Sequence, residues 1–209
     1  MRRSWEEAMK GEGRSSAPQR ENAPEALRLF VSLDPPEAAR QAVMEAVQAA
    51  RPLLPPGWNW SAAAKLHLTL RFIGETGASL LPEFRRILEE VAAAHPPLTL
   101  TLGGWGAFPH FARPRVLWLG VADDPPGTLV ALARELARRL PGDDAKPFQP
   151  HLTLARTQEP PLLSPEIPDA LPPVQTSWSA GEIRLLRSTL TPRGSVYTPL
   201  HRARLGGVA

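Results

Sequence analysis

The chain has 209 residues, of which 43% are hydrophobic, which is enough for one globular domain or two small lobes. It contains no cysteine, and this excludes disulfides, thiolate catalysis and cysteine-based zinc sites. Lysine and arginine outnumber aspartate and glutamate by 24 to 21, and the net charge of +3 is too small for a strong nonspecific nucleic-acid binder.

Residues 1–25 are polar, contain glycine and serine, and lack an apolar period, so we predict a disordered tail. The first residues lack the apolar core of a secretion signal, and no apolar run approaches the length of a transmembrane helix. We therefore expect a cytoplasmic protein without membrane contact. The last residues, 206–209, are expected to fray.

Strands and helices alternate through the first half of the chain. Residues 27–33 predict a strand, and the prolines after Asp34 predict a helix from Glu37 to Arg51, with Asp34 able to cap it. The remaining elements predicted in this half are an extended piece at 58–60, strands at 65–73 and 98–105, and a helix at 80–94.

The second half continues with a strand at 115–121 and a helix that opens after Asp124 and runs to Leu140. A strand at 151–157 follows, and the proline-rich residues 159–173 predict a surface loop. Three further strands are predicted at 174–178, 181–190 and 195–204, with a hairpin at 191–194 between the last two.

The same tetrapeptide, His-Leu-Thr-Leu, occurs at 67–70 and again at 151–154. Each copy falls on a predicted strand, where successive side chains point to opposite faces. The His and Thr of each copy therefore share one face, suited to a cleft, and the two Leu share the other, suited to a core. A single His-x-Thr is common by chance, but packing alone hardly explains two identical copies among only five histidines.

If folding places these strands side by side, His67, His151, Thr69 and Thr153 point into one space. An imidazole titrates near neutral pH, so one of the two can accept a proton while the other donates one. The threonine hydroxyls can donate hydrogen bonds to anionic oxygens. Cleavage of a phosphodiester requires this set, because an oxygen must be activated, a leaving oxygen protonated and the non-bridging oxygens bound.

The order of elements shows two roughly equivalent units, each with a helix and a His-x-Thr strand. No wider repeat is detectable between them. We therefore predict an α+β fold of two lobes around a central cleft, with a pseudo-twofold axis between the His-x-Thr strands.

The two motifs and their surroundings resemble the two-histidine (2H) phosphoesterases. Residues 66–75 and 148–156 are similar to the bacterial 2′-5′ RNA ligase branch, also called RNA 2′,3′-cyclic phosphodiesterase. Further similar segments are 28–31, 113–120 and 196–200. The resemblance covers about residues 26–205 and implies one bilobal domain of mostly antiparallel sheet, with the helices outside.

The resemblance also implies the substrate, which is an RNA 3′ end carrying a 2′,3′-cyclic phosphate, or a nucleotide 2′,3′-cyclic phosphate. His67 and His151 are the candidate acid–base pair, and Thr69 and Thr153 the candidate phosphate donors. Hydrolysis would break the bond to O3′ and leave a 2′-phosphate. The reverse reaction with a 5′-hydroxyl would make a 2′-5′ linkage. Because the motifs are identical, the sequence does not distinguish the acid from the base.

Two arginines are further candidates for phosphate binding. Arg71 shares the face of His67 and Thr69 if its strand stays regular. Arg156 has the wrong parity for the face of His151, so it reaches the site only past the strand end or after a bulge. The family has an arginine there in its second motif. For each arginine, a surface ion pair is an equally good interpretation.

Phe72, Phe148 and Tyr197 are candidates to stack on a base, although an aromatic side chain beside a strand more often packs in the core. Arg115 and Trp118 match the family's middle segment, but no chemistry requires them. Residues 181–209 hold five arginines against one glutamate, which suits either contact with a polyanion or a solvated sheet face.

We predict an enzyme that needs no metal and no cofactor, because two histidines are too few ligands for zinc and two imidazoles already share the proton transfers. We expect a monomer without an obligate protein partner. Two alternatives stay open: a non-catalytic RNA- or nucleotide-binding protein, and a 2H enzyme that acts on a small nucleotide such as ADP-ribose cyclic phosphate or 2′-5′ oligoadenylate.

Overall fold

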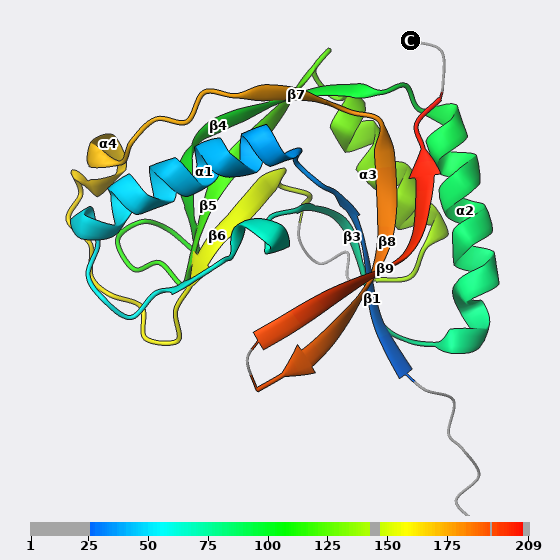
Figure 1. The fold of residues 1–209 in the computed structure, drawn as a ribbon, viewed down its shortest axis with the longest axis horizontal. Helices are drawn as coiled ribbons and strands as arrows, with labels where there is room; N and C mark the ends of the chain where they lie inside the picture. The colour runs from blue at the N-terminus through cyan, green and yellow to red at the C-terminus, as the bar shows by residue number, and fades with distance from the viewer. Residues whose placement is uncertain (1–25, 143–146, 193, 207–209) are drawn as a thin grey trace, which may run out of the picture.

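One curled antiparallel sheet forms the framework of the protein (Figure 1). The computed structural model describes residues 26–142, 147–192 and 194–206, so the predicted N-terminal tail and residues 207–209 lie outside the described residues. Within them, the strand order is β7-β4-β5-β6-β3-β1-β8-β9, with β2 beside β6. The strands are β1 Ala26–Leu33, β2 Asn59–Trp60, β3 Leu68–Gly77, β4 Leu98–Phe108, β5 Val116–Asp124, β6 His151–Arg156, β7 Ser177–Ala180, β8 Glu182–Thr191 and β9 Gly194–Arg204.

The two motif strands, β3 and β6, lie at the centre of this order. Each is the innermost strand of one half of the sheet. The two halves have four strands each, β3-β1-β8-β9 on one side and β6-β5-β4-β7 on the other. Every adjacent pair is antiparallel, and β3 meets β6 through the single pair Leu68 and Leu152. The predicted α+β fold with two related lobes is confirmed.

The helices α1 Glu37–Ala50, α2 Leu81–Ala94 and α3 Thr128–Arg139 pack against this sheet (Figure 1). Alanine, valine and leucine at helical spacing give each helix one buried side. The end of α1 packs on the β5–β6 half, where Ala50 joins Leu117 and Ala155 in a small apolar cluster. α2 and α3 lie beside the other half in the figure. No helix in the described residues is long and apolar enough to span a membrane.

One local prediction from the sequence is wrong, and another is only partly right. Asp34 does not cap α1, whose N-cap is Pro36; its carboxylate accepts a hydrogen bond from Ser32 and pairs with Arg184 instead. The proline-rich residues 159–173 are not purely a surface loop. They carry the short helix α4 Ile167–Ala170, and Leu163 and Leu171 are buried in the same cluster as Ala50. Their apolar side chains, rather than local propensity, hold this segment on the sheet.

The junction of the two halves makes a stability prediction. Replacing the fully buried Leu152 by alanine leaves a cavity against Leu68, so we expect the free energy of unfolding to fall by about 2–5 kcal/mol. Leu162→Ala is the matched control, because this leucine is 80% exposed and its loss should change stability by under about 0.5 kcal/mol. Urea denaturation followed by circular dichroism measures both variants, and equal midpoints would contradict the role given to the junction.

Candidate active site

The active-site candidate lies where β3 meets β6. Because these strands run antiparallel through Leu68 and Leu152, their register sets His67 across from Thr153, and His151 across from Thr69. The leucines are buried, and the four polar side chains lie half-buried on the opposite face. The structure therefore brings the two motifs together with both histidines and both threonines on one side of the sheet.

These four side chains line one cleft of about 570 Å³, which we call the catalytic cleft. Its other walls come from β1, the short helix η2 Ala63–Lys65, and the β8–β9 pair. The remaining lining residues are Arg28, Phe30, Ser61, Lys65, Phe72, Arg156, Ser188, Ser195 and Tyr197. The cleft thus combines proton-transfer groups, hydroxyl donors, cations and aromatic rings.

Both imidazoles are held in the same way. Nδ1 of His67 lies 2.7 Å from the carbonyl oxygen of Lys65, and Nδ1 of His151 lies 2.6 Å from that of Gln149. A carbonyl oxygen only accepts hydrogen bonds, so Nδ1 of each ring carries the proton and donates it. In the neutral ring, Nε2 therefore keeps its lone pair and is the nitrogen available to a ligand.

Each histidine packs against two aromatic rings that also contact each other. The ring centroids of His67, Phe30 and Tyr197 lie 5.0–5.2 Å from one another. Those of His151, Phe108 and Trp118 lie 5.1–5.8 Å from one another. The two aromatic rings of each cluster therefore lie together beside the imidazole, and their packing restricts how far it can turn.

The Trp118 indole needs a glycine beneath it. A Cβ added at Gly106, the β4 residue that pairs with Trp118, would lie 2.1 Å from the indole ring. Any larger residue at position 106 would displace the indole that flanks His151. This requirement links a residue remote from the motifs to the position of a candidate catalytic ring.

Burial lowers the pKa of both histidines from the ordinary value of 6.5. The positive charge of Arg156 lowers both pKa values further, whereas the hydrogen bonds to the backbone carbonyls oppose the shift. Each ring is therefore mainly neutral at pH 7 and able to accept a proton. Because the unfolded chain binds these protons at higher pH, the two rings reduce the stability of the folded state as the pH falls below 6.5.

A bulge at the same place in each motif decides which side chains follow the histidines into the cleft. On β3, the register with β1 slips between Thr69 and Arg71. On β6, the register with β5 slips between Thr153 and Ala155. The extra residue reverses the alternation of faces, so the fifth residue after each histidine returns to the cleft. These residues are Phe72 and Arg156.

The expectation that Arg71 shares the face of His67 is wrong, because its strand does not stay regular. Arg71 is buried, and its guanidinium donates to the carbonyl oxygens of Leu140 and Pro141 at 3.0 Å each. It ties the loop after α3 to the back of the motif strand. Arg156, by contrast, enters the catalytic cleft after a bulge, which is one of the two routes that the sequence allowed.

The three aromatic candidates have different environments. Phe72 is 42% exposed in the catalytic cleft, with the guanidinium carbon of Arg28 5.0 Å from its ring centre. Tyr197 lines the cleft edge-on to His67. Phe148 is partly buried against the main core and does not line the cleft, which favours the core interpretation for this ring.

Sequence reasoning missed two cations of the cleft, Arg28 and Lys65. Lys65 lies two residues before His67, and Arg28 is the first residue of a segment that resembles the family. Their positions in the sequence could therefore have indicated that both belong to the site. In the described part of the chain no carboxylate lines this cleft, and neither of these cations nor Arg156 forms an ion pair. The cleft is therefore a site for an anion.

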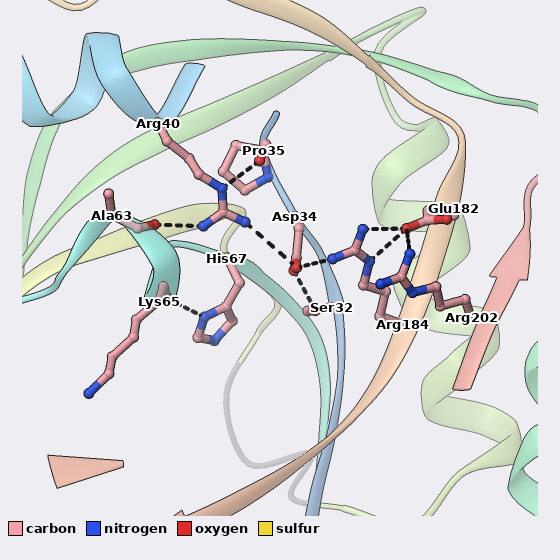
Figure 2. A network of polar contacts seen from close by, with 10 residues as sticks. All are labelled: Ser32, Asp34, Pro35, Arg40, Ala63, Lys65, His67, Glu182, Arg184 and Arg202. Atoms are coloured by element: carbon pink, nitrogen blue, oxygen red, sulfur yellow. Dashed lines mark hydrogen bonds and ion pairs between the residues drawn. The ribbon is translucent and has the colours of Figure 1, made fainter. Parts of the chain in front are cut away.

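Two of the five C-terminal arginines form ion pairs outside the cleft. Arg184 binds Asp34 and Glu182, and Arg202 lies 4.0 Å from Glu182, which favours the surface interpretation for these two arginines. Figure 2 shows how this network reaches the motif: Asp34 also faces Arg40, whose guanidinium donates to the carbonyl oxygen of Ala63 at 2.6 Å. Ala63 opens η2, whose last residue provides the carbonyl that holds His67.

No cluster of three or more His, Asp or Glu side chains among the described residues could hold a metal ion. The polar groups of the cleft are suited to an anion instead.

The ring geometry makes a spectroscopic prediction. In ¹⁵N-histidine-labelled protein, we expect His67 and His151 to show the Nδ1–H tautomer at pH 7.5 and to titrate below pH 6.5, because burial disfavours the charged form. His67→Gln and His151→Gln assign the two signals. A titration midpoint at or above 6.5 for either ring, or a dominant Nε2–H form, would show that the rings are held differently.

Known proteins are similar to this chain in sequence and fold. An RNA 2′,3′-cyclic phosphodiesterase of Thermus thermophilus is 36% identical over 189 residues, which cover 87% of this chain and 91% of that protein. A crystal structure of a Thermus thermophilus protein superposes with a TM-score of 0.73 at 34% identity and covers 87% of this chain and 99% of that one.

Escherichia coli LigT complexed with 3′-AMP superposes with a TM-score of 0.66 at 33% identity, covering 87% of this chain and 99% of that one. The 2′-5′ RNA ligase superfamily matches residues 31–191, which include both motifs and most of the described sheet. The chain therefore belongs to the 2′-5′ RNA ligase superfamily.

Proposed function

We propose that this protein hydrolyses RNA 2′,3′-cyclic phosphate ends to 2′-phosphates. The observation that carries the proposal is the pair of imidazoles in one cationic cleft, each with Nδ1 bound to a carbonyl and Nε2 left for a ligand. Curated relatives named RNA 2′,3′-cyclic phosphodiesterase, at 27–36% identity, support the substrate class. The aromatic rings and cations are suited to a nucleotide and its phosphate.

The reaction requires two proton transfers around one phosphorus atom. Nε2 of one histidine accepts a proton from water as the water oxygen bonds to phosphorus. The other histidine, protonated, gives its proton to O3′ as the bond from phosphorus to O3′ breaks, which leaves the 2′-phosphate. The hydroxyls of Thr69 and Thr153 donate to the non-bridging oxygens, and Arg156 and Lys65 offset their negative charge.

The mechanism needs one neutral and one protonated ring at the same time. Both rings are mainly neutral in the free protein because burial lowers both pKa values. The bound phosphate anion raises the pKa of the ring it contacts, so substrate binding itself favours uptake of the required proton. The rate should therefore follow a bell-shaped pH profile.

The same groups can activate a different nucleophile. If a 5′-hydroxyl takes the place of water, its oxygen attacks the cyclic phosphate and O3′ leaves, which forms a 2′-5′ linkage. We propose that the protein both makes and cleaves such linkages, as the name of its superfamily suggests. Water is at far higher concentration than RNA ends, so hydrolysis dominates.

We further propose that the protein acts as a monomer in the cytoplasm. The absence of cysteine is compatible with a reducing compartment, and one chain provides both histidines of the cleft.

Removing either histidine should slow the reaction strongly. We expect His67→Ala and His151→Ala each to lower kcat by at least ~10²-fold on a short RNA with a 2′,3′-cyclic phosphate end, because each removes one proton-transfer group. His110→Ala, which changes an exposed histidine outside the cleft, is the matched control and should keep the wild-type rate. Full activity in either cleft variant, with folding verified by circular dichroism, would refute the assignment.

Chelation should leave the reaction intact. We expect an EDTA-treated sample to convert the cyclic phosphate to a 2′-phosphate at an unchanged rate, because the two imidazoles and the cations supply the chemistry. Mass spectrometry and comparison with synthetic 2′- and 3′-phosphate standards identify the product. Loss of turnover that Mg²⁺ or Zn²⁺ restores would show that a metal takes part.

A further inference from the structure

A second hollow adjoins the catalytic cleft on the side of β5 and β6. It has a volume of about 810 Å³, and its wall includes Asn59, Arg115, Arg156 and Gln158. We call it the side cleft. This inference rests on the proposed function. We propose that the side cleft binds the penultimate nucleotide of the RNA, which precedes the nucleotide that carries the cyclic phosphate. Arg115 would contact the phosphodiester that joins these two nucleotides.

The two clefts share a wall. Arg156 lines both of them, so a chain that extends from one cleft into the other passes this residue. In the sheet, Arg156 pairs with Asn59 on β2 and with Val116 on β5, which sets three side chains in a row across three strands. All three residues line the side cleft, and Arg156 at the centre of the row also lines the catalytic cleft.

The charges of the side cleft favour an anion. Among the described residues, the Arg115 side chain makes one hydrogen bond, from its guanidinium to the carbonyl oxygen of Gln158 at 3.3 Å. Within the described ranges neither Arg115 nor Arg156 forms an ion pair, whereas Arg40, Arg139 and Arg184 do. Among the described residues of the wall, two are arginines and Glu159 is the one carboxylate, so positive charge is in excess. A phosphodiester would provide the acceptor that Arg115 lacks.

Size favours this side over the other edge of the catalytic cleft. At that edge, Arg28 lines both the catalytic cleft and a neighbouring hollow of about 230 Å³, which Arg187 also lines. Ligand sites are usually about 300–1,000 Å³, a range that includes the side cleft and excludes the smaller hollow. The side cleft is therefore the better site for a whole nucleotide.

This arrangement makes the protein selective for RNA ends over single nucleotides. A nucleoside 2′,3′-cyclic phosphate fills only the catalytic cleft, whereas an oligonucleotide also places a phosphodiester beside Arg115. The binding free energy of the second cleft should appear as a higher kcat/KM for the oligonucleotide. The quantity to measure is the ratio of kcat/KM for the two substrates.

The test compares five variants, one of which, Arg187→Ala, probes the opposite edge of the catalytic cleft, on adenosine 2′,3′-cyclic phosphate and on a ten-nucleotide RNA ending in a 2′,3′-cyclic phosphate. We expect Arg115→Ala and Gln158→Glu each to lower the ratio about five- to tenfold, because one removes a cation and the other adds an anion at an exposed position. Gln158→Lys should raise the ratio. Arg113→Ala is the control, since this exposed arginine lies two residues away and does not line the side cleft.

Salt dependence gives an independent measure. For the ten-nucleotide RNA, the slope of log kcat/KM against log salt concentration should become shallower by about 0.7 in Arg115→Ala, as expected for one lost phosphate contact on a single strand. A merely structural role of Arg115 would not change this slope.

The outcomes separate the two proposals. If the wild-type protein hydrolyses both substrates but Arg115→Ala leaves the ratio and the salt slope unchanged, the side cleft does not bind RNA, and the proposed function stands. If Arg187→Ala lowers the ratio and Arg115→Ala does not, the RNA leaves by the opposite edge, which also overturns this inference. If the wild-type protein hydrolyses neither substrate, the proposed function fails and this inference fails with it.

Discussion

The contact between β3 and β6 is the constraint on which the site depends. Leu68 and Leu152 are fully buried and pair directly, and within the described residues this pair alone joins the two halves of the sheet through β3 and β6. Since the partners are at equivalent places in identical tetrapeptides, their pairing sets each histidine opposite the threonine of the other copy. Hydrophobic burial on one face of the sheet thus determines the arrangement of polar groups on the other.

The symmetry of the site extends beyond the tetrapeptides. Each half adds the same kind of carbonyl contact to Nδ1, two aromatic rings beside the histidine and a bulge at the same place in the motif. The halves differ in the side chain that follows the bulge into the cleft. This side chain is the aromatic ring of Phe72 on β3 and the cationic guanidinium of Arg156 on β6. A symmetric framework therefore carries an asymmetric ligand surface, as a phosphate joined to a base on one side requires.

Much of this site followed from the sequence, because a strand alternates its faces and the repeated motif specified which residues share a face. The assignment of Arg71 failed because the bulge depends on pairing with β1, a strand almost forty residues away, and no local pattern reports that register slip. Asp34 was misassigned for a similar reason, since its partner Arg184 is 150 residues away. Lys65, in contrast, was visible two residues before His67 and was overlooked.

The position of β1 has a consequence for how the chain acquires its fold. β1 lies between β3 and β8, and its residues Leu29 to Ser32 pair with residues 184–187. While the polypeptide is being synthesised, one edge of β1 stays unpaired until nearly the whole chain has left the ribosome. Such long-range pairing slows folding and leaves a strand edge open to association with other chains. The wall of the catalytic cleft that contains Arg28 and Phe30 is therefore among the last parts of the molecule to form.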